Sequence, residues 1–415
     1  MNTTQSVEES LISGRTPLRS LASRWKAACS SGFSAALWRL PNQSFRELLV
    51  DTSGRVETAR MDFDELPPGF AVSPFFNPDN QHTLFLNADL YWRFAEDGEI
   101  EAEIFRQSSD HPAVRRFLAE IGDGQMEPPV SFDVSPLLNG QAQEQYEKMV
   151  ERAIRHISRG EMRKVVLSRT KTVDFADFPD VLTLFDRLCH AYPTAFVSAV
   201  YLPDRQQIWL GATPERLVSQ DASGLFRTVA LAGTQSAFDS EGQPKRTGDA
   251  QWTEKEIEEQ ALVCRYIISC FKKIRLREYT EEGPRTVVAG NLMHLRTDFS
   301  VNTQDVNFPQ LATVMLQLLH PTSAVCGMPK ETATDFILQQ EGYDRELYSG
   351  YLGPVNIAST GNGPDTNLFV NLRCMKLEGK KGTLYAGAGI TEDSVPAREW
   401  RETELKCQTL LGIMN

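Results

Sequence analysis

A short segment near the C-terminus, PAREWRETELK at 396–406, holds three carboxylates and one cation: Glu399, Glu402, Glu404 and Lys406. At about 100° per residue, a helix places Glu399, Glu402 and Lys406 in one sector of its surface. An ordinary helix face exposed to solvent is one explanation for such charges. However, the preceding glycine-rich run, TLYAGAGI, brings bare backbone N–H groups to the same spot. Backbone donors suit an anionic ligand and clustered carboxylates suit Mg²⁺, so the pattern favours a carboxylate ligand held through a metal.

Lys164 lies in an apolar run, MRKVVLSRT, that is typical of a β-strand. A lysine at a strand edge is usually a solvated charge that prevents aggregation. If the side chain points instead into a site that already holds a cation, its pKa falls from about 10.4 and the neutral amine can act as a base. The residues alone leave both interpretations open.

Glu215 follows Pro214 in LGATPERL, a pattern that predicts a helix or turn with Glu215 among its first residues. A carboxylate at that position stabilises a helix N-terminus. If apolar walls bury it, its pKa rises and it can serve as an acid.

Glu256 and Glu259 lie one turn apart on a long helix expected at about 250–274. Glu259 borders the buried stripe of this helix, and a carboxylate there needs a partner. Lys255 or an arginine can supply it, or Glu259 can bind a metal opposite Glu402. Spacing alone does not choose between these partners.

The 415 residues are 41% hydrophobic, which is enough for a sizeable core. The net charge of −12 disfavours non-specific binding to nucleic acid or to anionic membranes. No run approaches the roughly 18 to 20 apolar residues that span a bilayer, and the acidic N-terminus has no apolar signal region, so we expect a cytoplasmic protein. Seven cysteines without a C-x-x-C pair predict neither a disulfide framework nor a zinc site, and we expect small buried side chains at Cys29, Cys189, Cys264, Cys270, Cys326, Cys374 and Cys407.

The order of elements predicts mainly antiparallel sheets in one interwoven domain over 1–415. Short alternating runs from about 30 to 130 predict strands joined by turns. An amphipathic helix is expected at 141–160, with His156 as a surface or capping residue. The remaining predictions are strands at 164–175, 194–203 and 207–220 and a hairpin at 368–390.

Nine motifs taken in order resemble the chorismate-utilising enzymes, and specifically the isochorismate synthases of menaquinone and siderophore pathways: KVVLSR, GATPE, LAGT, KEIEEQALV, LHPTSAVCGMPK, DRELYSG, NLRCMKL, AGAGI and EWRETELK. The resemblance covers about 145–412, whereas 1–130 matches loosely. It implies an α+β chorismate-binding fold of the anthranilate synthase component I type. In that fold two antiparallel β-sheets pack face to face with helices outside.

The resemblance also implies a reaction, the Mg²⁺-dependent conversion of chorismate to isochorismate. Water adds at C2 of the ring and the hydroxyl leaves from C4. Lys164 matches the base that activates water, and Glu215 matches the acid that protonates the leaving hydroxyl. Glu259 and Glu402 match the Mg²⁺ ligands, with Glu399 bound directly or through water.

Further positions match residues that bind the substrate. They comprise backbone from the glycine-rich segments, a histidine, two small loop residues and two cations: Gly233, Thr234, His294, Ala324, Val325, Arg373, Gly387, Ala388, Gly389 and Lys406.

Individual positions distinguish the branches of this family. Ammonia-using members tend to have glutamine where this chain has Lys164, so we expect no glutaminase subunit. Ala232 stands where aminodeoxychorismate synthases place a nucleophilic lysine. Ala324 and Val325 favour release of isochorismate over the pyruvate elimination of salicylate synthases. Gln260 departs from relatives that have histidine there.

Two alternatives stay open beside isochorismate synthase. One is a salicylate synthase on the same scaffold, and the other is a non-catalytic homologue that binds chorismate. The resemblance implies a monomer, and the pathway that uses the product stays open among menaquinone, siderophore and salicylate synthesis.

Overall fold

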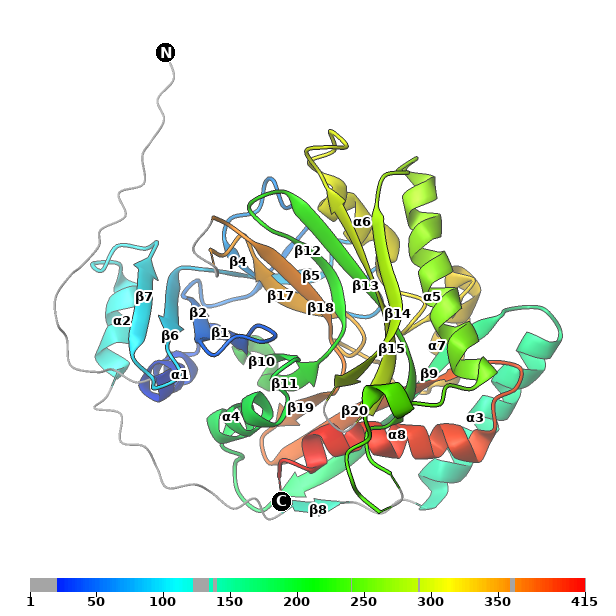
Figure 1. Cartoon of the computed structure of the whole chain (residues 1–415). Helices are drawn as coiled ribbons and strands as arrows, with labels where there is room; N and C mark the ends of the chain where they lie inside the picture. Colours follow the sequence, from blue (N-terminus) through cyan, green and yellow to red (C-terminus); the bar gives the residue numbers. More distant parts are fainter. Residues whose placement is uncertain are drawn as a thin grey trace.

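The computed structural model describes residues 21–121, 134–136, 140–239, 241–289, 292–358 and 363–414. Within these ranges the chain forms two antiparallel β-sheets with helices packed around them (Figure 1). Sheet A runs, in spatial order, through β16 (Gly327–Met328), β9 (Lys164–Phe175), β20 (Lys381–Ile390), β19 (Cys374–Glu378), β11 (Gln207–Thr213), β10 (Phe196–Leu202), β1 (Ser34–Arg39), β2 (Arg46–Asp51), β6 (Leu90–Phe94) and β7 (Ile100–Phe105), and β8 (Val134–Pro136) pairs with β9.

Sheet B is built in the same antiparallel way. Its spatial order is β14 (Thr280–Ala289), β15 (Leu292–Asn302), β13 (Leu225–Ser236), β12 (Arg216–Gln220), β18 (Thr366–Val370), β17 (Tyr351–Val355), β4 (Gly69–Ser73), β5 (Thr83–Asn87) and β3 (Glu57–Ala59).

The helices of the described ranges are α1 (Leu21–Ser31), α2 (Pro112–Glu120), α3 (Gly140–Ser158), α4 (Val181–Ala191), α5 (Glu254–Lys273), α6 (Leu311–Leu319), α7 (Lys330–Gln340) and α8 (Pro396–Leu411), with short 3₁₀ turns at Pro203–Arg205 and Thr247–Asp249. None of them is both long and apolar enough to cross a membrane.

Apolar side chains fill the space between the sheets and the spaces under the helices. Between the sheets, Phe196 of β10 stacks on Phe369 of β18 with ring centroids 4.2 Å apart. A second core joins α5 and α6 to sheet B, and a third joins α1, α2, α4 and the end of α8 to sheet A. Strands from the N-terminal part of the chain therefore belong to both sheets, together with strands from the later part.

Local sequence explains where the two helices that flank the site begin. Thr253 caps α5 through a capping box with Glu256, whose carboxylate accepts hydrogen bonds from the Thr253 backbone N–H and hydroxyl at 2.7 and 2.6 Å. Pro396 occupies the first turn of α8, where its missing N–H leaves no helix hydrogen bond unmade.

Two predictions from the sequence are wrong. Pro214 and Glu215 open no helix; they link β11 of sheet A to β12 of sheet B, so the strand expected at 207–220 is two strands in different sheets. The N-terminal region also contains α2, because Val114 and Phe117 pack under an amphipathic helix rather than on a strand.

Other expectations are confirmed. The hairpin forms from β19 and β20, with Gly379 in the left-handed conformation at φ 61° that the tight turn requires. Its first strand is shorter than expected, because residues 368–370 belong to β18 of sheet B. His156 is exposed at the end of α3 and its Nδ1 lies 2.6 Å from Glu161. All seven cysteines are free; five are buried and Cys29 and Cys264 are partly exposed.

Candidate active site

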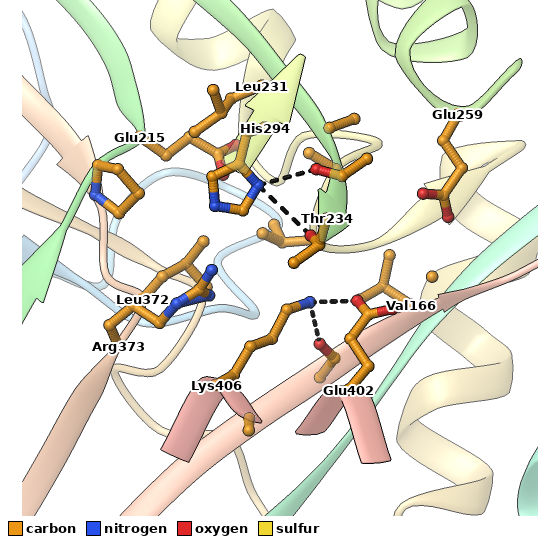
Figure 2. A pocket seen from close by; sticks show the side chains of 18 of the residues that line it. Val166, Glu215, Leu231, Thr234, Glu259, His294, Leu372, Arg373, Glu402 and Lys406 are labelled. Carbon is orange, nitrogen blue, oxygen red and sulfur yellow. Dashed lines mark hydrogen bonds and ion pairs between the residues drawn. The ribbon is translucent and has the colours of Figure 1, made fainter. Parts of the chain in front are cut away.

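One cavity between the sheets and α8 gathers nearly all of the candidate residues. β9, the β11–β12 link, β13, α5, β20 and α8 contribute to its wall. The lining residues are Lys164, Val166, Pro214, Glu215, Leu231, Ala232, Gly233, Thr234, Glu259, His294, Ala324, Val325, Tyr348, Leu372, Arg373, Tyr385, Ala386, Gly387, Gly389, Glu402 and Lys406. Residues more than 200 positions apart in the sequence thus meet at one site (Figure 2).

Lys164 and Glu259 lie against the backbone of β20 at Gly389. A methyl group at Gly389 would stand 2.5 Å from Glu259 Oε1, 3.0 Å from Lys164 Cε and 3.4 Å from Lys164 Nζ. Lys164 is only 3% exposed, so it is not a solvated strand-edge charge. The glycine therefore creates the space in which the amine and the carboxylate approach each other.

Glu215 is buried and points into the cavity. Burial raises its pKa to about 7, although the positive charges of Arg373, Lys164 and Lys406 oppose the shift. At neutral pH a large fraction of this carboxyl group is protonated and can donate a proton. The acid suggested by the sequence therefore has the environment that such a role needs.

His294 is neutral and presents a nitrogen to the cavity. Its Nδ1 lies 2.8 Å from the Gly233 carbonyl oxygen and 3.4 Å from Thr234 Oγ1, as Figure 2 shows. The carbonyl can only accept, so Nδ1 carries the proton. Burial and the charge of Arg373 lower the pKa of His294 to about 3, and the buried Nε2 has no partner among the described residues. Nε2 is thus available to accept a hydrogen bond from a ligand or water.

Two cations reach the cavity, one from the segment before β19 and one from α8. Arg373 precedes β19 in the left-handed conformation at φ 49°, and no described residue forms an ion pair or hydrogen bond with its guanidinium. Burial lowers its pKa, which increases its need for an anion. Lys406 projects from α8 and donates to the Gly387 carbonyl and to Glu402 Oε1, both at 2.7 Å. Together they give a negatively charged protein a local anion site.

Three carboxylates surround one end of the cavity. Glu259 projects from α5 and Glu402 from α8 on the opposite wall (Figure 2). Glu399 lies one turn before Glu402 and is 1% exposed. It forms an ion pair with Lys255 at 2.6 Å. Lys255 is therefore the partner of Glu399 and not of Glu259, which the sequence had left open.

Burial and neighbouring charges shift the pKa values of these three acids. Burial and the nearby charge of Glu402 raise the pKa of Glu259, with Lys164 opposing. Burial also raises the pKa of Glu399, with Lys255 opposing. Burial acts the same way on Glu402, yet the adjacent Lys406 ammonium lowers its pKa overall. An additional cation among these groups would relieve the repulsion between them.

The donor set fits Mg²⁺ in chemistry but is not assembled around an ion. Within the described ranges no three acidic, histidine or cysteine side chains stand close enough to share a metal. Lys406 and Lys255 instead pair with Glu402 and Glu399, and the buried Glu399 Oε2 has no hydrogen-bond partner. Carboxylate oxygens are what Mg²⁺ prefers, so the residues suit the ion once these pairs open.

Two candidates lie outside the cavity wall. Ala388 points to the other face of β20, because side chains alternate along a strand, and it packs in the core under α3 and α7. Its side chain therefore does not contact a ligand in this cavity. Glu399 lies beneath the wall and bonds Lys255.

Two aromatic residues of the wall were not predicted. Tyr348 and Tyr385 stack with centroids 5.3 Å apart, and Tyr385 also stacks on Trp209 at 5.4 Å. Both tyrosines lie inside motifs that the sequence does show, DRELYSG and TLYAGAGI. Strand alternation around Gly387 and Gly389 would have placed Tyr385 on the face of the site.

Comparisons with known proteins identify the family of the chain. The family described as "Chorismate binding enzyme" matches residues 112–415. The chain belongs to this family. Isochorismate synthase EntC of Escherichia coli K12 is 33% identical over 269 residues, which cover 65% of this chain and 66% of that protein. The chain thus matches about two thirds of the length of this curated relative.

Solved structures of the family share the fold. The menaquinone-specific isochorismate synthase MenF of Escherichia coli superposes with a TM-score of 0.75 at 22% identity, covering 96% of this chain and 93% of that chain. Anthranilate synthase component I of Streptococcus pneumoniae gives a TM-score of 0.64 at 20% identity, with coverage of 91% and 92%. The predicted α+β chorismate-binding fold is therefore confirmed, including the loosely matching N-terminal part.

Proposed function

We propose that this chain is an isochorismate synthase, an isomerase that converts chorismate to isochorismate. The observation that carries the proposal is that Lys164, Glu215 and Arg373 line one cavity, so an amine, an acid and an anion-binding cation face the same ligand. EntC and MenF, both named isochorismate synthases, are 33% and 30% identical to it over about two thirds of its length.

Each step has a residue suited to it. Lys164 serves as the base for the water that adds at C2. Glu215, protonated because burial raises its pKa to about 7, gives its proton to the hydroxyl that leaves from C4. Hydroxide is a poor leaving group, so this protonation is needed at the moment the C–O bond breaks. General acids and bases each contribute roughly 10² to 10⁴ in rate.

Binding of the substrate carboxylates falls to the two cations. Arg373 forms no ion pair with an acid in the described part of the chain, and a guanidinium matches a carboxylate with two parallel hydrogen bonds. The volume of the cavity is about 70 Å³, well below the ~300 to 1,000 Å³ of ordinary small-ligand sites. Glu402 and Lys406 extend into the space (Figure 2), so we infer that the substrate separates this pair as it enters.

Mg²⁺ is part of the proposal. Glu259 and Glu402, with Glu399 directly or through water, would hold it once Lys406 turns to the substrate. A bound Mg²⁺ would draw electron density toward the ring carboxylate and make C2 more electrophilic.

The proposal is tested with purified protein, chorismate and Mg²⁺, without glutamine or ammonia, and with the products separated by chromatography. We expect isochorismate in equilibrium with chorismate. Salicylate plus pyruvate would instead establish the salicylate synthase alternative. Binding of chorismate without any product would establish the non-catalytic alternative.

A further inference from the structure

A second cavity, of about 560 Å³, opens at the edge of the space between the sheets. Its wall comes from β12, the start of β13, β18 and the segment that follows β1. It shares no lining residue with the active-site cavity. Its size lies within the ~300 to 1,000 Å³ of ordinary small-ligand sites.

Arg216 in this wall is a cation without a counter-ion. No hydrogen bond or ion pair joins its guanidinium to any described residue, and its Nε is fully buried. Its guanidinium carbon lies 5.8 Å from the centroid of the Phe369 ring. Burial and the charges of Arg296 and Arg227 lower the pKa of Arg216 to about 10. Arg216 is partly exposed, so a ligand can reach its guanidinium, and a carboxylate or phosphate matches the planar fork of that group.

The acids that line the same cavity already have partners. Asp221 accepts an ion pair from Arg227 at 2.9 Å and hydrogen bonds from the Ser223 hydroxyl and the Leu225 backbone N–H. Asp365 accepts the backbone N–H of Ala222 at 3.1 Å. Neither carboxylate is paired with Arg216.

Two further buried polar atoms in the wall lack partners in the described chain, Ser219 Oγ and Gln220 Oε1. Ser219 follows Arg216 on the same strand, and its hydroxyl can donate to an anion. A cation, a hydroxyl group and an amide oxygen therefore line one cavity without bonding to other described residues.

We propose that this cavity binds a small oxyanion, a carboxylate or phosphate group, through the Arg216 guanidinium and the Ser219 hydroxyl. The Glu215 carbonyl, one position before Arg216, accepts the Val370 N–H at 2.9 Å, next to Phe369. An occupant of this cavity therefore contacts the residue adjacent to the candidate acid.

Calorimetric titration and thermal unfolding of the whole chain test this proposal without chorismate. The probes are inorganic phosphate and, separately, acetate, each against chloride at equal ionic strength. We expect at least one probe to bind and to raise Tm. We also expect R216Q to fold, because the Arg216 guanidinium makes no hydrogen bond or ion pair with a described residue, and to bind at least tenfold more weakly. The exposed arginine variant R55Q should bind like the wild type, since Arg55 pairs only with Glu57 at the surface.

R216K gives a second measurement that keeps the positive charge. It should also bind more weakly than the wild type, because an ammonium lacks the two parallel donors. Binding that is equal in the wild type, R216Q and R216K, or absent with both probes, would overturn the proposal. These outcomes are independent of whether the chain converts chorismate.

Discussion

Burial moves the pKa of Glu215 up to about 7 and that of His294 down to about 3, and it favours the neutral form of each. A neutral carboxyl group can donate a proton, and a neutral imidazole with its proton on Nδ1 can accept a hydrogen bond at Nε2. The same low-polarity cavity thus gives one residue the character of an acid and the other that of an acceptor.

The pH dependence of turnover follows from Glu215. Because the acid must be protonated, we expect kcat to fall as pH rises through about 7. The variant E215Q should lose roughly 10² to 10⁴ of kcat and this dependence with it. Initial rates between pH 5.5 and 9 provide the measurement, and an exposed control, E281Q, should behave like the wild type. A wild-type profile that stays flat through pH 8 would contradict the assignment.

The free energy of unfolding should also depend on pH through the ionisation of Glu215. The folded pKa of Glu215 lies above its unfolded value, so folding loses stability as pH rises from about 4.5 to about 7. E215Q cannot ionise and should exceed the wild type in unfolding free energy by roughly 1 to 3 kcal/mol at pH 8. The difference should shrink at pH 5.5. Denaturant unfolding at the two pH values measures it, and an equal difference at both would refute the shift.

Gly389 supplies a steric test of the Lys164 and Glu259 arrangement. In G389A the new methyl group would lie 2.5 Å from Glu259 Oε1, so both side chains must move. We expect a loss of at least tenfold in turnover with the fold retained. In the control G248A the added methyl group meets no atom within 4 Å, and activity should be unchanged. Full activity of G389A would show that the close approach is not needed.

At the scale of elements, one ion pair connects α5 to α8. Lys255 bonds Glu399, whose side chain is 2% exposed, so the pair fixes the two helices that carry Glu259 and Glu402. Removing only the lysine leaves a buried carboxylate uncompensated.

We therefore expect K255M to lower the unfolding free energy by roughly 1 to 3 kcal/mol, since Lys255 is itself partly exposed. The double variant K255M/E399L should recover most of this loss. The solvent-exposed pair of Lys148 and Glu144 is the control, and breaking it should have a much smaller effect on stability. Equal losses for K255M and the double variant would show that the pair does not couple the helices.

The sequence predicts elements well where one pattern decides them. The amphipathic helix α3, the long helix α5 and the β19–β20 hairpin follow from periodicity and a glycine turn. The prediction at Pro214 was wrong because a proline before a charged residue also fits a link between two sheets. No local sequence pattern reveals such a link. Strand alternation would have excluded Ala388 and included Tyr385, whereas the pairing of Lys255 with Glu399 depends on how α5 docks against α8.

At the scale of the whole molecule, the two sheets converge on one cavity and the acidic ends of α5 and α8 face each other across it. Strands from the N-terminal part belong to both sheets, whereas every residue that lines the cavity lies between Lys164 and Lys406. The layer order itself was expected only from the family resemblance, since periodicity does not specify how sheets stack.

A cation that joins α5 and α8 should stabilise the molecule as well as activate it. We expect millimolar Mg²⁺ to raise Tm of the chelator-treated wild type, since a ligand that binds the folded state stabilises it. The rise should be absent in E259Q and E402Q, and chelation should stop turnover until Mg²⁺ is restored. An equal rise in both variants would contradict these ligands.

The most direct test of the central claim is the origin of the new hydroxyl. Wild-type protein is incubated with chorismate and Mg²⁺ in ¹⁸O-labelled water, without glutamine or ammonia, and the products are analysed by mass spectrometry. The account predicts isochorismate with ¹⁸O in the C2 hydroxyl, and none above background from E215Q. Isochorismate without the label, or salicylate with pyruvate as the products, would contradict it.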